Sequence, residues 1–111
     1  MIPQIETVEG LNAVEAIAAV PGVDALWLGH FDLTNFMGMP GQFQHPDYLA
    51  GVKRIAAACA AHGKTAAFLA TDNNWANEYT GHGFRLFAFG IDQLMLQGAL
   101  KAGLDNLRAM R

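Results

Sequence analysis

The amino-acid sequence predicts an α/β protein with a parallel sheet, and three observations support this fold class. Segments with strand character and segments with helical character alternate along the chain. The strand-like segments are short and apolar on both faces, which is typical of parallel strands buried beneath helices. The helix-like segments carry apolar residues at three- and four-residue spacing, as helices with one buried face do. The order βαβαβαβα therefore predicts a parallel sheet with helical crossovers.

Four segments have strand character. Each consists mainly of apolar residues, and each after the first follows a turn or a helix-breaking pair such as Pro21-Gly22. We expect strands over Ile2–Glu6, Ala25–Gly29, Thr65–Leu69 and Leu86–Gly90.

The segments between the strands are predicted as helices. The first runs over about Gly10–Ala19. A longer helix begins at Pro46, which suits a first helical turn, and ends near Ala61, where Gly63 takes the left-handed cap position. The segment Phe31–Met37 is expected to form a loop or a short turn of helix.

Two further helices are predicted in the second half of the chain. Asp72 or Asn73 is placed to cap a short helix that ends near Gly81, since both residue types favour the N-cap position. In the last segment, apolar residues recur at helical spacing, and Asp92 is placed to cap this helix. The recurring residues are Leu96, Leu100, Leu104 and Leu107.

Two architectures fit this order of elements. One is a small open α/β sheet, and the other is the C-terminal half, about four βα units, of a TIM (β/α)₈ barrel, which needs about 250 residues when complete. The chain has 111 residues, so we expect one domain over residues 1–111. A core-like strand begins at Ile2 without a lead-in, as it could in either a complete domain or a fragment.

Composition excludes several classes of protein. The chain is 52% hydrophobic and 15% charged, which allows a sizeable core and argues against disorder. The net charge of −3 comes without a basic stripe, so a nucleic-acid partner is not expected. No apolar run approaches a membrane span. Cys59 is the single cysteine, which excludes a disulfide framework and fits a cytoplasmic location.

Acidic side chains gather where the predicted strands end. Parallel sheets bind ligands at the carboxyl ends of their strands, and there the chain carries Glu6 and Asp32 on adjacent strands. Gln4 lies two residues before Glu6, on the same side of its strand. Two carboxylates without a histidine or thiolate partner suit a hard cation such as Mg²⁺ or Mn²⁺. The alternative use of each acid is to cap a helix or to pair with a base.

The four histidines have different expected roles. His62 and His82 each precede a glycine at a helix end and are predicted to be structural. His45 lies in a loop and is expected to be solvated. His30 lies two residues before Asp32, where it could contact substrate, act as an acid or base near neutral pH, or be held by solvent or a backbone hydrogen bond.

Two motifs make the sequence resemble a known family. They are PQIET at Pro3–Thr7 and PGVDALWLGHFDLTNFMGMPGQFQHP at Pro21–Pro46, which combine Q-I-E-T with G-x-x-D-L-S/T and G-x-P-G-x-x-x-H-P. The chain resembles the HpcH/HpaI aldolase family along essentially its whole length. This resemblance implies a TIM barrel and a carbon–carbon lyase, an aldolase that forms or cleaves 2-oxo-acid aldols through a metal-bound pyruvate enolate.

The resemblance also implies roles for individual residues. Glu6 and Asp32 match the family's ligands to a divalent metal ion, which is Mg²⁺, Mn²⁺ or Co²⁺. The loop from Gly29 to Asp32, which includes His30 and Phe31, matches the segment that binds the pyruvate carboxylate, and Gln4 matches a glutamine that lines the same pocket. The family's catalytic arginine and its histidine–aspartate base pair belong to the first three strands of the barrel. The resemblance implies that this chain begins at the fifth strand, so we expect a fragment that lacks the first strands. No catalytic residue is therefore assigned in this chain, with His30 as the one candidate.

The sequence leaves alternatives to the aldolase open. One is a lyase acting on CoA esters, as in the citrate-lyase-like relatives, although no CoA-binding surface is recognisable. Others are a non-catalytic half barrel that self-associates and a small stand-alone α/β binding module. For the aldolase we expect a small 2-oxo acid and an aldehyde as substrates, and no nucleic acid or membrane partner. A half barrel exposes apolar edges, so we expect a homo-oligomer or pairing with a complementary half barrel.

Overall fold

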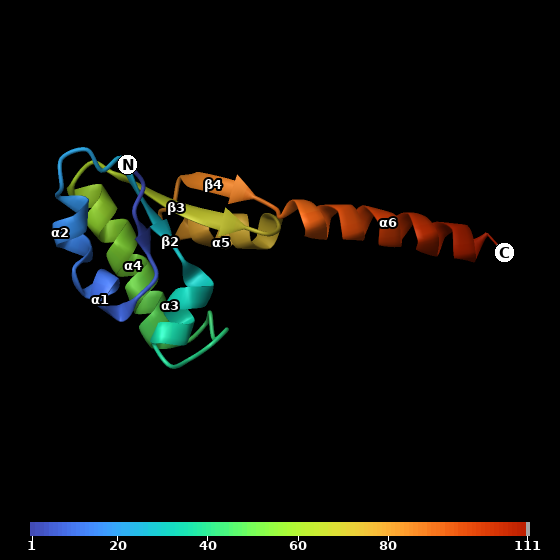
Figure 1. The fold of residues 1–111 in the computed structure, drawn as a ribbon, viewed down its shortest axis with the longest axis horizontal. Helices are drawn as coiled ribbons and strands as arrows, with labels where there is room; N and C mark the ends of the chain where they lie inside the picture. Colours follow the sequence, from blue (N-terminus) through green and yellow to red (C-terminus); the bar gives the residue numbers. More distant parts are fainter. Residues whose placement is uncertain (111) are drawn as a thin grey trace.

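Four strands form one parallel sheet in the order β1-β2-β3-β4, with the strands adjacent in the order of the chain. A computed structural model describes residues 1–110 of the protein (Figure 1). The strands are β1 (Gln4–Ile5), β2 (Ala25–Leu28), β3 (Thr65–Ala70) and β4 (Leu86–Phe89). The prediction of a parallel sheet with helical crossovers is confirmed, and each strand begins or ends within two residues of its predicted bounds.

Helices connect the strands and follow the last one. They are α1 (Val8–Asn12), α2 (Val14–Ala18), α3 (His30–Phe36), α4 (Pro46–Ala61), α5 (Asn73–Gly81) and α6 (Asp92–Ala109). The sequence placed α4 correctly, because Pro46 is its first residue and Gly63 follows it at a φ of 63°. The described residues contain no helix long and apolar enough to cross a membrane.

Two sequence predictions about helices are wrong. The single helix expected over Gly10–Ala19 is two short helices, separated at Ala13, whose φ of −100° and ψ of 8° are not helical. The first begins early because the Thr7 hydroxyl accepts a hydrogen bond from the Gly10 N–H at 3.0 Å. Asp92 does not cap α6: it is the first residue of the helix, and the N-cap residue, Ile91, makes no side-chain hydrogen bond.

The two faces of the sheet have different surroundings. The outer face packs under α4 and α5 and carries fully buried side chains such as Leu28 and Phe68. The opposite, inner face is lined by residues that alternate with these, and strand pairing places Gln4 beside Trp27 on it. The larger inner-face side chains, such as Trp27 and Leu86, are partly or largely exposed, whereas the small Ala25 and Ala67 are buried. In a closed barrel this face would be the interior.

The core lies between the outer face of the sheet and the helices α2, α4 and α5. At one end, α4 approaches the first helical segment closely, because a Cβ on Gly51 would lie 3.0 Å from Leu11. The Arg54 Nε donates to Glu15 Oε1 at 2.7 Å, which joins α4 to α2. These contacts hold the helical layer against β1 and β2, whose carboxyl ends carry the predicted site.

Aromatic side chains fill the other end of the core. The Phe68 and Tyr79 rings stack with centroids 3.6 Å apart, and Trp75 stacks on Phe68 at 5.5 Å. The Tyr48 and Tyr79 hydroxyls lie 2.6 Å apart and are buried, so each is the hydrogen-bond partner of the other. Burial raises the pKa of both phenols, that of Tyr79 to about 12. The cluster therefore fixes α5 against both the sheet and α4.

Helix α6 does not pack on this core. It extends away from the sheet as a single long arm (Figure 1), and the protein consequently measures 60 × 29 × 21 Å. None of its residues that the structure describes is buried. The amphipathic helix predicted from the leucine spacing is present, but its apolar side has no partner in the described part of the chain.

Candidate functional site

Gln4, Glu6 and Gly29 come together where β1 and β2 end. The Gly29 N–H donates to the Ile5 carbonyl at 3.0 Å, so the strand pairing continues into the predicted loop. The Gln4 amide Nε2 donates to Glu6 Oε2 at 2.5 Å, on the inner face of the sheet. This hydrogen bond fixes the orientation of the Glu6 carboxylate.

Because Gly29 has no side chain, the Gln4 and Glu6 side chains can occupy the space beside it. A Cβ at this position would lie 2.6 Å from Gln4 Nε2 and 2.7 Å from Glu6 Cβ, closer than real side chains approach. Its φ of −85° is one that any residue can adopt, so the glycine is required by the close approach and not by the backbone conformation. Any larger residue at position 29 would therefore displace the Gln4 and Glu6 side chains.

Helix α3 begins directly at this point. Gly29 is its N-cap residue and no side chain caps it, while Asp32 lies in its first turn and is exposed. The first N–H groups of a helix have no partner within the helix, and the positive end of the helix dipole favours an anion there. The structure thus places the uncapped start of α3 next to the glutamate and glutamine of β1.

The donor set fits a hard divalent cation. The described residues contain no group of three or more His, Cys, Asp or Glu side chains that could surround a metal ion. Glu6 and Asp32 follow two hydrogen-bonded strands, and a pair of carboxylates is the protein contribution that Mg²⁺ commonly uses while retaining water ligands. Open positions of this kind are also what a chelating substrate needs.

His30 is buried in an aromatic environment. It is 4% exposed, and its ring centroid lies 4.5 Å from that of Phe31, 4.8 Å from that of Phe68 and 5.1 Å from that of Trp75. Its Nε2 atom has no hydrogen-bond partner among the described residues. Burial lowers the pKa of the imidazole to about 4. His30 is therefore neutral at pH 7, which removes the role of a general acid in this state of the chain. Of the alternatives that the sequence left open, the structure excludes solvation and shows a hydrogen bond to the Leu28 backbone.

Several residues have the structural roles that the sequence predicted. The Asp72 carboxylate caps α5 by accepting hydrogen bonds from the Asn74 N–H at 2.8 Å and the Trp75 N–H at 3.0 Å. His62 and His82 are the C-cap residues of α4 and α5. Cys59 is buried, and burial raises the pKa of its thiol.

The His45 side chain is 36% exposed, in line with its prediction as a solvated loop residue, but it also has a role that the sequence did not predict. It is the N-cap residue of α4, and its Nδ1 accepts a hydrogen bond from the Asp47 N–H at 3.2 Å. Histidine is an uncommon N-cap residue, so the sequence pattern gave little indication of this role.

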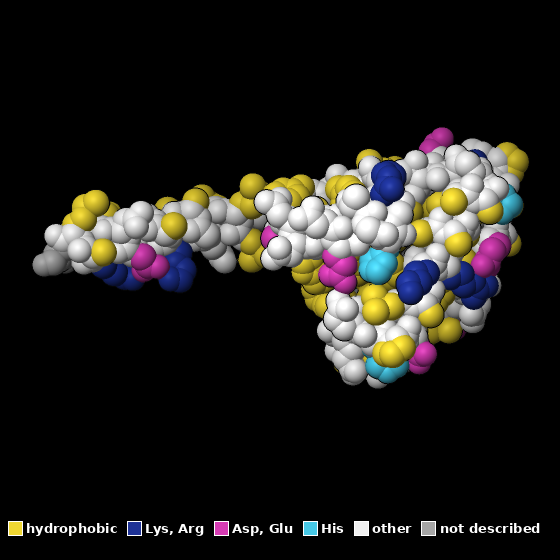
Figure 2. All heavy atoms as spheres, turned by 180° about the vertical axis from the view of Figure 1, so that it is seen from behind, with side chains coloured by type: hydrophobic (Ala, Val, Ile, Leu, Met, Phe, Trp, Pro, Cys, Tyr) yellow, Lys and Arg dark blue, Asp and Glu magenta, His cyan; other side chains and the backbone are white. Residues whose placement is uncertain are grey.

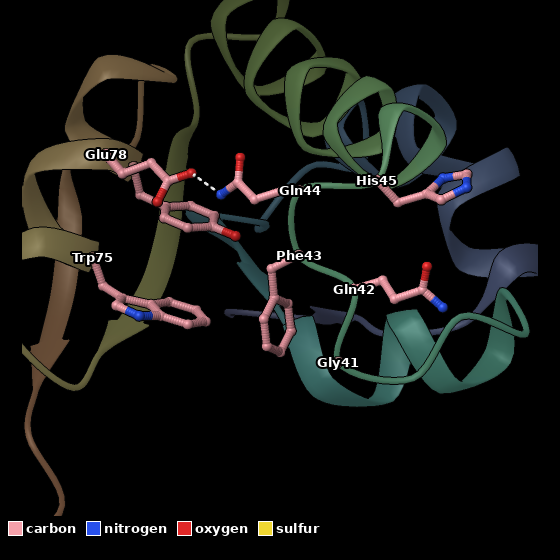
Figure 3. A pocket seen from close by; sticks show the side chains of 8 residues that line it. Gly41, Gln42, Phe43, Gln44, His45, Trp75 and Glu78 are labelled. Atoms are coloured by element: carbon pink, nitrogen blue, oxygen red, sulfur yellow. Dashed lines mark hydrogen bonds between the residues drawn. The ribbon is translucent and has the colours of Figure 1, made fainter.

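A cavity of about 570 Å³ was not anticipated (Figure 3). It adjoins the aromatic part of the predicted site, because Phe43, one of its lining residues, packs against Phe31 with ring centroids 5.1 Å apart. The cavity lies between the loop that precedes α4 and helix α5. A hydrogen bond from Gln44 Nε2 in this loop to Glu78 Oε1 in α5, at 2.7 Å, connects the two segments. Phe43 and Trp75 both line the cavity and contact each other edge to face, with ring centroids 5.0 Å apart. The glycine- and proline-containing segment before Pro46 was the only sequence signal for this loop. Its lining residues are Gly41, Gln42, Phe43, Gln44, His45, Trp75, Glu78 and Tyr79.

Comparison with known proteins identifies the family. Residues 1–99 match the family described as HpcH/HpaI aldolase/citrate lyase. The chain belongs to this family. The HpcH/HpaI resemblance drawn from the motifs around Glu6 and Asp32 is thereby confirmed.

Individual members of the HpcH/HpaI family show how much of a complete enzyme the chain represents. It is 37% identical over 108 residues to a hydroxypyruvate/pyruvate aldolase of Paraburkholderia phytofirmans, covering 97% of this chain and 42% of the relative. It is 37% identical over 107 residues to a 5-keto-4-deoxy-D-glucarate aldolase of Salmonella arizonae, covering 96% of this chain and 40% of that protein. The chain thus spans about two fifths of the length of the curated relatives it matches.

A solved structure also shows that the chain corresponds to about two fifths of a complete family member. An HpcH/HpaI aldolase/citrate lyase family protein from Burkholderia cenocepacia superposes with a TM-score of 0.90 and 36% identity, covering 96% of this chain and 42% of that one. The family's structures are TIM-barrel enzymes, so the four parallel βα units of this chain correspond to half of such a barrel. This outcome selects the half barrel over the small open α/β sheet.

Proposed function

We propose that this chain supplies the part of a 2-oxo-acid aldolase that binds the metal ion and the substrate carboxylate. The complete enzyme would be a carbon–carbon lyase with pyruvate or a related 2-oxo acid and an aldehyde as substrates. The observation that carries the proposal is the junction at Gly29, the N-cap residue of α3. The Glu6 side chain packs against this glycine, and its carboxylate accepts a hydrogen bond from the Gln4 amide at 2.5 Å. Membership of the aldolase/citrate lyase family supports a lyase function.

Each residue at the junction has a proposed task. Glu6 and Asp32 would hold a divalent cation, Mg²⁺ or Mn²⁺ or Co²⁺, and Gln4 would keep Glu6 in the orientation required. The N–H groups at the start of α3, from His30 to Asp32, would bind the carboxylate of the 2-oxo acid, with the Phe31 ring beside them. When bound, the cation would act as a Lewis acid towards the keto oxygen and stabilise negative charge that develops there.

Turnover would need residues from outside this chain. His30 is the histidine nearest to the junction in sequence, and with a pKa of about 4 it is a weak base in its aromatic environment. We therefore propose that the base and the cationic group of the reaction come from the remainder of the barrel. That remainder could pack against the inner face of the sheet, where Trp27 is partly exposed and Leu86 is 39% exposed.

The proposal is tested by Mn²⁺ binding to the full chain, measured by calorimetry with and without pyruvate. We expect Mn²⁺ to bind, pyruvate to tighten the binding, and Glu6→Gln to weaken it by at least about tenfold, since the variant loses a charged ligand but keeps its size. Glu9→Gln is the matched control, because Glu9 is an exposed acid in α1 and should leave the affinity unchanged.

Two results would contradict the proposal. One is Mn²⁺ binding that Glu6→Gln and Asp32→Asn leave intact, which would place the ion elsewhere. The other is the absence of Mn²⁺ binding by a chain whose far-ultraviolet circular dichroism shows it to be folded, and the non-catalytic half barrel would then be the better description.

A further inference from the structure

The cavity between the loop that precedes α4 and helix α5 has the size of a small-molecule site. Its volume of about 570 Å³ lies within the range of about 300–1,000 Å³ that ligand pockets occupy. Neither Glu6 nor Asp32 lines it, so the metal site proposed above leaves this cavity without a role. The residues that do line it indicate which class of ligand it would accept.

The loop wall of the cavity is held in place by contacts within the protein. The Thr34 side chain is 0% exposed, and its hydroxyl accepts a hydrogen bond from the Gly41 N–H at 3.1 Å and donates one to the Phe31 carbonyl at 2.8 Å. Farther along the loop, Phe43 packs edge to face against Trp75 with ring centroids 5.0 Å apart. The cavity is thus formed in the chain by itself, so a ligand would not have to order the loop in order to bind.

Helix α5 supplies the second wall from one of its faces. Trp75, Glu78 and Tyr79 are three and four residues apart, so their side chains are neighbours on the helix surface. The Tyr79 hydroxyl is already paired with that of Tyr48 at 2.6 Å, and Tyr79 therefore presents its ring to the cavity without a free hydroxyl. Together with Trp75 and with Phe43 from the loop, it makes much of the wall aromatic (Figure 3).

The charge on the cavity wall is negative. Among the described residues that line the cavity, Glu78 is the one acid, and there is no lysine or arginine. Gln44 Nε2 donates to Glu78 Oε1 at 2.7 Å, which orients the carboxylate and leaves Oε2 without a donor among the described residues. The His82 Nε2 atom is 4.0 Å from Oε1, too far for a hydrogen bond. On the loop side, His45 Nδ1 accepts the Asp47 N–H at 3.2 Å, a role that requires this nitrogen to be unprotonated.

Charges elsewhere on the surface are too dispersed to offset this carboxylate. The chain has a net charge of −3. On the face of the body that Figure 2 shows, acidic and basic side chains of the described residues lie singly or in small groups among hydrophobic and uncharged ones, without a broad basic patch. Exposed charges more than about 8–10 Å apart are largely screened at physiological ionic strength. A ligand in the cavity would therefore respond mainly to Glu78.

We propose that this cavity binds a small organic cation, an amidinium, guanidinium or protonated amine attached to an apolar body. The cationic group pairs with the Glu78 carboxylate, and the Gln44 carboxamide oxygen accepts a further N–H bond from it. The apolar body lies against the rings of Phe43 and Trp75, whose faces also attract a cation. A 2-oxo acid would meet the like charge of Glu78 here, which distinguishes this cavity from the candidate site at Gly29.

Benzamidine and benzamide test the proposal, because the two compounds have nearly the same shape and only benzamidine is positively charged. The binding of each to the ¹⁵N-labelled full chain is followed by two-dimensional ¹H–¹⁵N NMR. We expect benzamidine to bind in the millimolar range that is usual for so small a compound, and at least about fivefold more tightly than benzamide. The modest ratio reflects the Glu78 side chain, which is 38% exposed. The largest shifts should occur at the Trp75 indole N–H and the Gln44 side-chain amide.

Three variants locate the cation. Glu78→Gln removes the charge of an exposed side chain and keeps its size, so benzamidine should then bind only as tightly as benzamide does. Glu9→Gln removes an exposed carboxylate on α1 and is the matched control, which should bind benzamidine as the wild-type chain does. Glu6→Gln should also bind benzamidine normally while losing affinity for Mn²⁺, so the cation cavity and the metal site can fail independently of each other.

Three results would overturn the proposal. Equal affinities for benzamidine and benzamide would show that the cavity is an apolar pocket that does not select a cation. Benzamidine binding that survives Glu78→Gln, or that is lost in Glu6→Gln, would place the cation at another carboxylate. The absence of benzamidine binding at millimolar concentrations, by a chain whose NMR spectrum shows it to be folded, would leave the cavity without the proposed ligand.

Discussion

We expect His30→Phe to remove most of the loss of stability between pH 7 and about pH 4.5. Burial lowers the pKa of the His30 imidazole from its ordinary 6.5 to about 4. Because the folded-state pKa lies below that of the unfolded chain, the unfolded chain takes up the proton first. The free energy of unfolding therefore falls as the pH falls from 6.5 towards 4. At about 1.4 kcal/mol per pH unit, this loss amounts to about 3 kcal/mol for the one side chain.

A phenylalanine side chain is also compatible with the surroundings of His30. The imidazole already lies among aromatic rings, and its Nε2 is buried without a hydrogen-bond partner among the described residues, so a phenyl ring removes an unsatisfied polar atom. Urea denaturation of wild type and variant, followed by circular dichroism at about pH 7, 5.5 and 4.5, measures the effect. His62→Phe, at an exposed position at the end of α4, is the control and should retain the wild-type pH dependence. A variant as acid-sensitive as wild type would show that other groups govern the response.

Three other substitutions test the packing described above. Tyr79→Phe should lower the free energy of unfolding by about 1–3 kcal/mol in urea denaturation, because the buried Tyr48 hydroxyl loses its partner, and Tyr48→Phe in the same chain should restore most of this. The pair also predicts alkaline sensitivity: burial raises the pKa of Tyr79 from 10 to about 12, so stability should fall as the pH rises through this interval in wild type but not in the double variant. Gly29→Ala should cost about 1–3 kcal/mol and weaken Mn²⁺ binding by displacing the β1 side chains, whereas Gly81→Ala, which meets only open space, should do neither. Asp72→Ala should lower the melting temperature through a loss of about 1 kcal/mol from the α5 cap, and Asp72→Asn, which keeps the acceptor oxygen, should recover most of it.

The sequence predicted the elements whose signals are local. Pro46 and Gly63 gave the bounds of α4, Asp72 gave the start of α5, and short apolar runs gave all four strands. The sequence also predicted that Gln4 and Glu6 lie on the same side of the chain at the carboxyl end of β1, because the alternation of side chains along a strand depends only on the backbone. These predictions hold because each rests on the covalent properties of a few adjacent residues.

The remaining features depend on contacts between distant parts of the chain. The environment of His30 is set by Phe68 and Trp75, which are far from it in sequence, so spacing alone could not distinguish a buried imidazole from a solvated one. The leucine stripe of α6 predicted an amphipathic helix correctly but contained no information about which surface it meets. The strand-end positions of Glu6 and Asp32 suited a hard cation, but helix capping or ion pairing suited them equally, and only the family motifs favoured the metal ion over these uses.

The two tryptophans of the chain lie on opposite faces of the sheet, and each can serve as an optical reporter. Trp27 pairs with Gln4 on the inner face, whereas Trp75 lies in the aromatic cluster with His30 at 5.1 Å. Protonation of His30 should alter the fluorescence of Trp75, and ligand binding near Glu6 should alter that of Trp27. Spectra of Trp27→Phe and Trp75→Phe would therefore separate events at the candidate site from events in the core without any added label.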